Sequence, residues 1–182
     1  SRARYHLLWD DALYREHLAR RKPDLVVIAY GTNEAGDDLI PITEYETDLL
    51  HMVSRVRETV PQASCLLIGP SDRPTHNPDH TWGPRPRTDE IVQAQRRVAA
   101  AVGCGFFDLV TFMGGPMSMM RWVHSEPPWG RPDHVHFTRL GYEALGNVLH
   151  DALLAGYEDT SVEPISRVTA PSEPSPSTLQ SP

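Results

Sequence analysis

Cysteine, net positive charge and long apolar runs are all scarce in this sequence. The two cysteines, Cys65 and Cys104, lie in apolar stretches without CxxC spacing, a pattern that predicts neither a disulfide framework nor a zinc knuckle. The formal net charge of −7 argues against a phosphate-binding surface and therefore against nucleic acid as a partner. No run approaches the roughly 18 apolar residues of a membrane span, and the first residues show no basic-then-apolar signal pattern.

Proline is abundant instead, with 17 residues that concentrate in segment 69–86 and after Glu158. The last segment, 159–182, mixes serine, proline and threonine with hardly any large apolar residue, so it cannot bury enough surface to offset its ordering entropy. The apolar content of 40% gives the preceding residues the material for one core. The sequence therefore predicts one globular domain over residues 1–158 and a disordered tail over residues 159–182.

Short apolar runs alternate with helical patterns along this domain. The run from Leu25 to Tyr30 is continuous, which predicts a strand that is covered on both faces in a parallel sheet. Further strands are predicted at Cys65 to Ile68 and at Phe106 to Asp108. Strands separated by helices imply an α/β fold, a parallel sheet between helix layers, with the active crevice beyond the carboxyl ends of the strands.

Four helices are predicted between and around these strands. The first runs from about Asp10 to Arg21, and the others are expected to begin at a capping box over residues 43–46, at Thr88 and at Thr138. The proline-rich segment 69–86 is expected to be a long loop. The last helix is expected to point four apolar side chains inward: Leu145, Val148, Leu149 and Ala152.

A Gly-Thr-Asn-Glu turn, Gly31 to Glu34, follows the first strand directly. The backbone can turn sharply there, and the amide of Asn33 can point into the crevice, where it would donate to an oxyanion. Taken alone, the turn is ordinary loop chemistry in which Asn33 bonds its own backbone.

Asp133 and His136 lie immediately before the last predicted helix. A spacing of three lets the carboxylate turn back onto the imidazole and fix its tautomer, which frees the other ring nitrogen to take a proton. The alternative interpretation is a loop histidine that merely packs.

The two motifs together resemble the SGNH or GDSL esterase/lipase family. The resemblance rests on Tyr-Gly-Thr-Asn-Glu after a strand and Asp-x-x-His-x-Thr-x-x-Gly-Tyr about a hundred residues later, and it covers residues 1 to about 157. It implies a flavodoxin-like three-layer α/β/α domain that hydrolyses esters. It makes Asn33 the oxyanion-hole amide, with Glu34 where the family usually has aspartate, and it makes His136 the base that Asp133 orients.

Two family residues, the nucleophilic serine and a glycine of the oxyanion hole, have no counterpart in this sequence. Ser71 also follows a strand and is an alternative nucleophile, but it lies downstream of Asn33 rather than upstream. The simpler interpretation is that the chain begins partway through the enzyme, because Ser1-Arg2-Ala3 reads like the residues after the missing glycine. A sheet of three strands would also leave an open apolar edge, so we expect about two further βα units before Ser1.

The resemblance also implies a mechanism and a class of substrate. Serine attacks the acyl carbon, His136 carries the proton to the leaving alcohol and Asp133 steadies the imidazolium, with no metal or organic cofactor. The rate is expected to fall at acid pH as His136 protonates. Similar proteins act on acyl or acetyl esters outside the cytoplasm, so a small-molecule or carbohydrate ester and a periplasmic or secreted location are implied.

Two other functions stay open. A metal-dependent hydrolase is suggested by six potential ligands, but segment 76–80 contains a proline and cannot present two imidazoles on a helix face. The second open function is carbohydrate binding by a catalytically inactive relative that has lost the serine. The potential ligands are His76, Asp79, His80, Asp133, His134 and His136.

A group of methionines and tryptophans between Asp108 and Asp133 has two interpretations. It packs a capping segment onto the sheet, or it lines an acyl or sugar pocket. Its members are Met113, Met117, Met119, Met120, Trp122 and Trp129.

Overall fold

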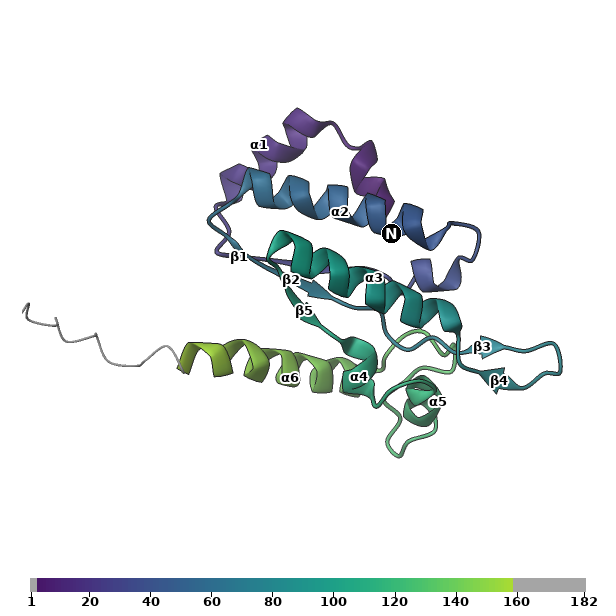
Figure 1. Cartoon of the computed structure of the whole chain (residues 1–182). Helices are drawn as coiled ribbons and strands as arrows, with labels where there is room; N and C mark the ends of the chain where they lie inside the picture. The colour runs from purple at the N-terminus through teal and green to yellow at the C-terminus, as the bar shows by residue number, and fades with distance from the viewer. Residues whose placement is uncertain (1–2, 159–182) are drawn as a thin grey trace, which may run out of the picture. The chain divides into compact units, whose positions relative to one another are not determined.

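The structure is a computed structural model that describes residues 3–158 (Figure 1). The chain divides into two compact units between Glu143 and Ala144. The predicted tail, 159–182, lies outside the described residues, as do Ser1 and Arg2, which entered the interpretation of where the chain begins. The sheet and the candidate site belong to the first unit.

The first unit contains a three-stranded parallel sheet in the order β1-β2-β5. The strands are β1 (Leu25–Ala29), β2 (Ser64–Ile68) and β5 (Gly105–Phe107). Helix α2 (Ile42–Thr59) connects β1 to β2, and helix α3 (Pro86–Val102) connects β2 to β5. The predicted alternation of parallel strands and helices is therefore confirmed.

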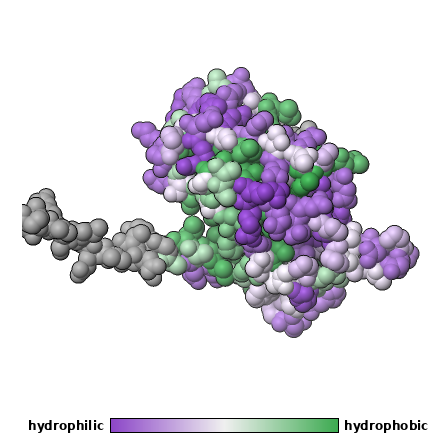
Figure 2. Space-filling model, viewed as in Figure 1, coloured by the Kyte–Doolittle hydropathy of each residue, from purple (hydrophilic) through white to green (hydrophobic). Residues whose placement is uncertain are grey.

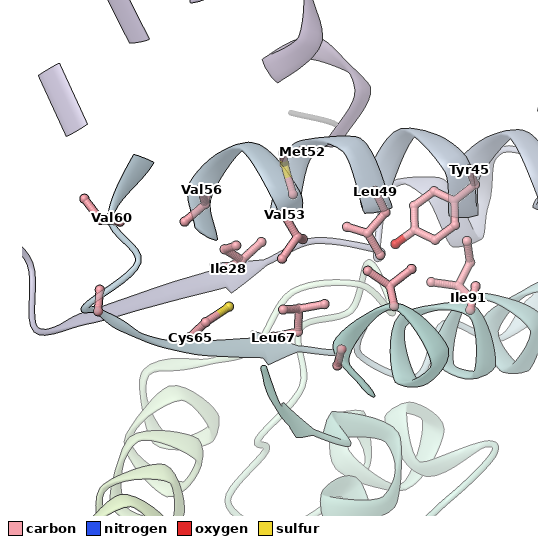
Figure 3. Packing of buried hydrophobic residues seen from close by; sticks show 14 of the residues in the cluster. Ile28, Tyr45, Leu49, Met52, Val53, Val56, Val60, Cys65, Leu67 and Ile91 are labelled. Carbon is pink, nitrogen blue, oxygen red and sulfur yellow. The ribbon is translucent and has the colours of Figure 1, made fainter. Parts of the chain in front are cut away.

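The core lies between one face of this sheet and the helices α2 and α3 (Figure 3). Leu49 and Val53, one helical turn apart on α2, point toward Ile28 and Leu67 of the strands, while Ile91 closes the core from α3. Four of these five side chains are at most 1% exposed. Burial of one such side chain contributes about 1.5–3 kcal/mol, so the periodic apolar positions fix this face of the sheet.

The opposite face of β1 is open, which contradicts the prediction of a strand covered on both faces. Side chains along a strand alternate between faces, and Leu25 and Val27 are 38% and 46% exposed while Ile28 is 7% exposed. Among residues 3–158, β1 pairs with β2 only. A continuous apolar run therefore shows that both faces of a strand could be buried, but in β1 only one face is buried.

Two helices begin at prolines rather than at the predicted side-chain caps. Helix α2 begins at Ile42 after Pro41, so the capping-box residues 43–46 lie inside the helix and no side chain caps it. Helix α3 begins at Pro86, and Thr88 lies within its first turn with a buried hydroxyl that has no hydrogen-bond partner among the described residues. Proline suits the start of a helix because its fixed φ is helical and no N–H is needed there.

The first and last predicted helices are confirmed. Helix α1 (Asp11–Arg21) follows a short 3-10 helix, η1 (Ala3–Leu8), and the carboxylate of Asp10 caps it by accepting the Leu13 N–H at 2.8 Å. Helix α6 (Arg139–Glu158) crosses the boundary between the two units.

For α6, the predicted N-terminal cap is confirmed, but the predicted inward-facing side chains are only partly confirmed. The hydroxyl of Thr138 accepts the Gly141 N–H at 3.4 Å, as the predicted cap requires. Leu145 and Leu149 are partly buried. Val148 is 41% exposed and Ala152 is also exposed, so the inward orientation is wrong for these two, whose apolar side chains remain in solvent.

The two cysteines form a disulfide, Cys65–Cys104, so the prediction from their spacing is wrong. Leu66 of β2 is in register with Gly105, the first residue of β5, so the residues just before them, Cys65 and Cys104, meet across 39 positions of sequence. Motif spacing carries no information about such a pair because strand register creates it.

Both segments predicted to be irregular contain short elements. Segment 69–86 includes an antiparallel hairpin of β3 (Thr75–His76) and β4 (Trp82–Gly83). The segment after Asp108 includes α4 (Leu109–Met113) and α5 (Ser118–Val123). Three members of its methionine and tryptophan group are buried: Met113, Met119 and Trp122. Within residues 3–158 no helix combines the length and apolar character needed to cross a membrane.

Candidate active site

The turn after β1 is held by hydrogen bonds between its own residues and leaves Asn33 exposed. Gly31 has φ of 117°, and a side chain there would meet Gln95 at 2.9 Å, so only glycine fits the position. The buried carboxylate of Glu34 accepts the Gly31 N–H at 3.1 Å, and the Ala35 N–H donates to the Gly31 carbonyl at 2.7 Å. Asn33 is exposed and directly precedes the 3-10 helix η2 (Glu34–Gly36).

Two arginines from other elements brace this turn. Arg73, which follows β2, donates from Nη1 at 2.7 Å to the carbonyl of Thr32, in the peptide group that joins Thr32 to Asn33. Its guanidinium lies so close to Gly36 that a Cβ there would come within 2.1 Å of it. Arg87 of α3 donates from Nε to another carbonyl of the turn at 3.3 Å. Charge-assisted bonds therefore hold the turn on both sides of Asn33, at the carbonyls of Thr32 and Glu34.

The proposed alternative nucleophile, Ser71, lies inside the structure. It is 4% exposed, and its hydroxyl lies 3.4 Å from the hydroxyl of Thr32. The Ser71 N–H also donates to the Thr32 hydroxyl at 3.2 Å. These contacts give Ser71 a role in joining the end of β2 to the turn, and its burial argues against attack on a substrate.

Asp72, the next residue, connects the sheet to α5. Its carboxylate is 3% exposed and accepts the Met119 N–H at 2.9 Å. Burial raises the pKa of Asp72 above its usual value, against the effect of that hydrogen bond. This bond attaches α5 to the loop that follows β2 at the carboxyl edge of the sheet.

Asp133 and His136 are brought together as the sequence predicts. Oδ2 of Asp133 lies 2.9 Å from Nδ1 of His136, while Oδ1 accepts the N–H groups of Val135 and His136, each at 2.9 Å. These bonds from His136 and Val135 hold the pKa of Asp133 well below its ordinary value, so it stays a carboxylate. A carboxylate at Nδ1 favours the tautomer with the proton on that nitrogen, which leaves Nε2 as the acceptor.

The chain reverses within this segment at His134, which has φ of 58°. The His136 side chain is 62% exposed and that of Asp133 is 47% exposed, so the pair faces solvent. The backbone around the pair is also held by a nearby residue, because the Arg131 N–H donates to the His136 carbonyl at 2.8 Å. The pair can therefore move a proton at an accessible nitrogen.

The helix start behind His136 needs a small residue. A Cβ at Gly141 would lie 2.3 Å from the carbonyl oxygen of Trp129, so backbone of the preceding loop approaches the first turn of α6 closely. Phe137, between the histidine and that turn, is 6% exposed. These packing requirements give a physical reason for the glycine of the Asp-x-x-His-x-Thr-x-x-Gly-Tyr pattern.

Contacts join the elements that carry the two motifs. Ser71 and Asp72 connect the Asn33 turn to the sheet and to α5, and the ring of Trp82 lies 4.4 Å from that of His134, centroid to centroid. That Asn33 and His136 face a common hydroxyl stays a prediction. Among residues 3–158, no three histidine, cysteine or acidic residues are grouped as a metal ion would require.

Sequence reasoning missed Arg73, Arg87 and Trp82. Each acts across more than 40 residues of sequence and belongs to no local motif. The tryptophan was visible only as an aromatic residue in a proline-rich segment, and the arginines as ordinary charges.

Comparison with known proteins shows the family of this chain. Residues 2–144 match the model of the GDSL-like lipase/acylhydrolase family. A solved structure described as a peptidoglycan O-acetylesterase in action is 32% identical, with a TM-score of 0.73 over 80% of this chain and 41% of that one. A lipase/acylhydrolase from Enterococcus faecalis is 26% identical, with a TM-score of 0.55 over 75% of this chain and 64% of that one.

A putative GDSL-like lipase from Parabacteroides merdae ATCC 43184 shares the fold at 19% identity and a TM-score of 0.57, over 79% of this chain and 68% of that one. No protein with a curated description matches the sequence. The chain spans less than two thirds of the length of the first two structures, at 41% and 64%. With its parallel sheet, its Gly-Thr-Asn turn and its paired Asp133 and His136, the chain belongs to the GDSL-like lipase/acylhydrolase family.

Proposed function

We propose that this chain is part of a serine esterase that hydrolyses acyl or acetyl esters, with esters carried by carbohydrate as the substrate class. The hydrogen bond between Asp133 and His136 is the observation that carries the proposal, because it prepares an exposed imidazole to accept a proton in a family of acylhydrolases. The similarity to a peptidoglycan O-acetylesterase supports the choice of a carbohydrate ester.

Each residue has one role in the proposed reaction. A serine hydroxyl attacks the acyl carbon while Nε2 of His136 takes its proton, and the imidazolium then gives that proton to the leaving alcohol. Asp133 holds the ring and stabilises its charge. The amide of Asn33 donates to the oxygen that becomes negative in the tetrahedral intermediate. Water repeats the sequence to release the acid and restore the serine.

The nucleophilic serine is expected outside residues 1–182. Ser71 is buried against the Thr32 hydroxyl, and residues 1–182 contain no Gly-Asp-Ser sequence. The open edge and open face of β1 are consistent with further strands and helices in the complete protein.

A periplasmic or secreted location is part of the proposal. The Cys65–Cys104 disulfide supports it, because disulfides form and persist mainly in oxidising compartments. A carbohydrate ester of a cell envelope or an extracellular polymer would be met there.

The experiment measures acetate release from 4-nitrophenyl acetate and from O-acetylated peptidoglycan fragments by the complete protein. His136→Ala is expected to lower kcat by at least about a thousandfold, because the serine loses its base. His51→Ala removes an exposed histidine of α2 and serves as the matched control.

Two results would overturn parts of this proposal, the first the role of His136 and the second the esterase activity itself. If His136→Ala hydrolyses both esters at the wild-type rate, the base is assigned to the wrong residue. If the complete protein binds acetylated fragments and hydrolyses neither ester, it is the inactive carbohydrate-binding relative, a candidate favoured by the lack of a family serine in residues 1–182.

A further inference from the structure

The β3–β4 hairpin places an exposed aromatic ring beside the Asp133–His136 segment. Trp82 is 37% exposed, and its ring lies 4.4 Å from that of His134, centroid to centroid, with 34° between the two planes. His76 meets the same indole edge-on, with centroids 5.1 Å apart. We refer to these three rings, His76, Trp82 and His134, as the Trp82 platform. His134 lies between the two members of the hydrogen-bonded pair, so the platform adjoins the proposed base.

Short-range bonds keep the hairpin rigid. His76 and Trp82 are directly opposed across its two strands. The carboxylate of Asp79 accepts both the N–H and the hydroxyl of Thr81, at 3.0 and 2.6 Å, and so fixes the turn. Arg85 donates to the hydroxyl of Thr75 at 3.1 Å. An indole held this way loses little conformational entropy when a ligand packs on it.

The surroundings of the platform are polar rather than apolar. Figure 2 shows the projecting β3–β4 hairpin mostly in purple to white, the colours of hydrophilic and intermediate residues. His80 adds another imidazole, 5.8 Å from His76 between ring centroids. Each imidazole can donate or accept a hydrogen bond, whereas an acyl chain would need a continuous apolar lining.

The chemistry of the platform fits a sugar ring. A pyranose has a face of C–H groups and a rim of hydroxyls, and the negative face of an indole attracts C–H groups while imidazoles can bond the hydroxyls. We propose that the Trp82 platform binds the carbohydrate part of the ester substrate and places its acetyl group at His136. This inference rests on the esterase proposed above, and it assigns recognition of the alcohol portion to the hairpin.

The test compares two esters that differ in the alcohol. The complete protein, Trp82→Ala and Trp82→Phe are assayed with O-acetylated peptidoglycan fragments and with ethyl acetate, which has no ring to stack. Trp82→Ala is expected to lower kcat/KM for the fragments about tenfold, mainly through KM, and to leave ethyl acetate within about twofold. Trp82→Phe is expected to restore part of the loss because it keeps an aromatic face.

Trp9→Ala is the matched control, since Trp9 is 52% exposed and its ring contacts are with His6 and Tyr14. It should change neither rate. An equal loss on both esters after Trp82→Ala would show that the indole only supports the His136 segment, and no loss on either would show that it binds no substrate. Both results overturn the inference.

Failure of the esterase itself gives a different pattern. If the wild-type protein hydrolyses neither ester, the proposed reaction fails. Binding of the same fragments, measured by calorimetry, then tests separately whether the Trp82 platform binds carbohydrate. Weaker binding by Trp82→Ala than by wild type would support the platform, whereas equal binding, or no binding by either, would overturn it.

Discussion

The Asn33 turn and the Asp133–His136 segment are held in different ways. The turn has local bonds of its own and is held in addition by residues far along the chain, since Arg73 in the loop after β2 and Arg87 of α3 bond its carbonyls. The other segment holds itself, because Asp133 accepts bonds from the backbone of Val135 and from both the backbone and the ring of His136. The turn is packed against the body of the sheet, and the segment is exposed.

This contrast explains where substitutions should act. An oxyanion donor must meet a charge that exists only during the reaction, so its position has to be set before the substrate arrives, and the tertiary braces provide that. A base needs access to solvent and to the serine, and a local carboxylate is enough to fix its ring. We therefore expect distant variants to change the Asn33 turn and only local variants to change the pair.

The largest effect is expected from Asp133→Asn. In asparagine the oxygen keeps accepting the N–H groups of Val135 and His136, so the NH2 group faces Nδ1 and donates to it. The ring then loses both its tautomer and its charge partner. We expect kcat of the complete protein to fall about ten-thousandfold, as in comparable triads. The thermal unfolding temperature should change little, because both side chains are 47% exposed or more. Glu126→Gln, at another exposed acid of the same loop region, is the control, and a comparable loss there would contradict the local account.

Asn33→Ala is expected to have the next largest effect. Loss of one oxyanion donor typically costs about a hundredfold in kcat, whereas KM should stay nearly constant because the donor acts in the transition state. Steady-state kinetics on acetyl esters measures both constants. Asn147→Ala, an exposed asparagine of α6, is the matched substitution. A rise in KM with unchanged kcat would instead make Asn33 a group that binds the ground state.

Arg73→Met should break the tertiary brace without touching a proposed catalytic group. We expect kcat to fall about tenfold, with no further loss when the substitution is added to Asn33→Ala, because both would remove the same interaction. Arg85→Met removes a neighbouring charge that bonds Asp38 and Thr75 but not the turn. Assayed with ethyl acetate, which does not need the hairpin that Arg85 holds, it shows whether a loss in Arg73→Met comes from the missing charge or from a displaced Asn33. If the double variant loses the product of the two single losses in kcat, Arg73 does not act by positioning Asn33.

The smallest expected effect is a change in pH dependence. The bonds from His136 and Val135 hold the pKa of Asp133 below its ordinary value, so the ionised carboxylate stabilises the folded chain at neutral pH, and this contribution is lost as the pH falls toward the folded-state pKa. The small difference in thermal unfolding temperature between the wild-type protein and Asp133→Asn should therefore narrow on acidification. Thermal unfolding of both proteins at neutral and acid pH measures it. A difference that is the same at both pH values would mean that these bonds do not stabilise the carboxylate.

The sequence predicts those parts of the molecule that depend on neighbouring residues. Apolar runs and helical periods locate the strands and helices, and the spacing of Asp133 and His136 predicts their bond, because three residues are enough to close it. Helix starts are less predictable, since Pro86 takes the place given to Thr88. A proline and a threonine both suit a first turn, and the path of the preceding loop decides between them.

Contacts set by the register and packing of distant segments are not predictable in this way. The Cys65–Cys104 disulfide follows from the pairing of β2 with β5, and the brace from Arg73 follows from the position of the loop after β2. Neither has a motif. The exposed face of β1 has the same origin, because an apolar run does not state which of its faces the fold covers.

The most direct test is a crystal structure of the complete protein after reaction with a phosphonate ester, whose phosphoryl oxygen occupies the place of the oxyanion. The account predicts that the adduct joins a serine, that Nδ2 of Asn33 lies about 3 Å from the phosphoryl oxygen, and that Nε2 of His136 lies within hydrogen-bond distance of the serine oxygen. An adduct with Asn33 or His136 far from the phosphorus would contradict it.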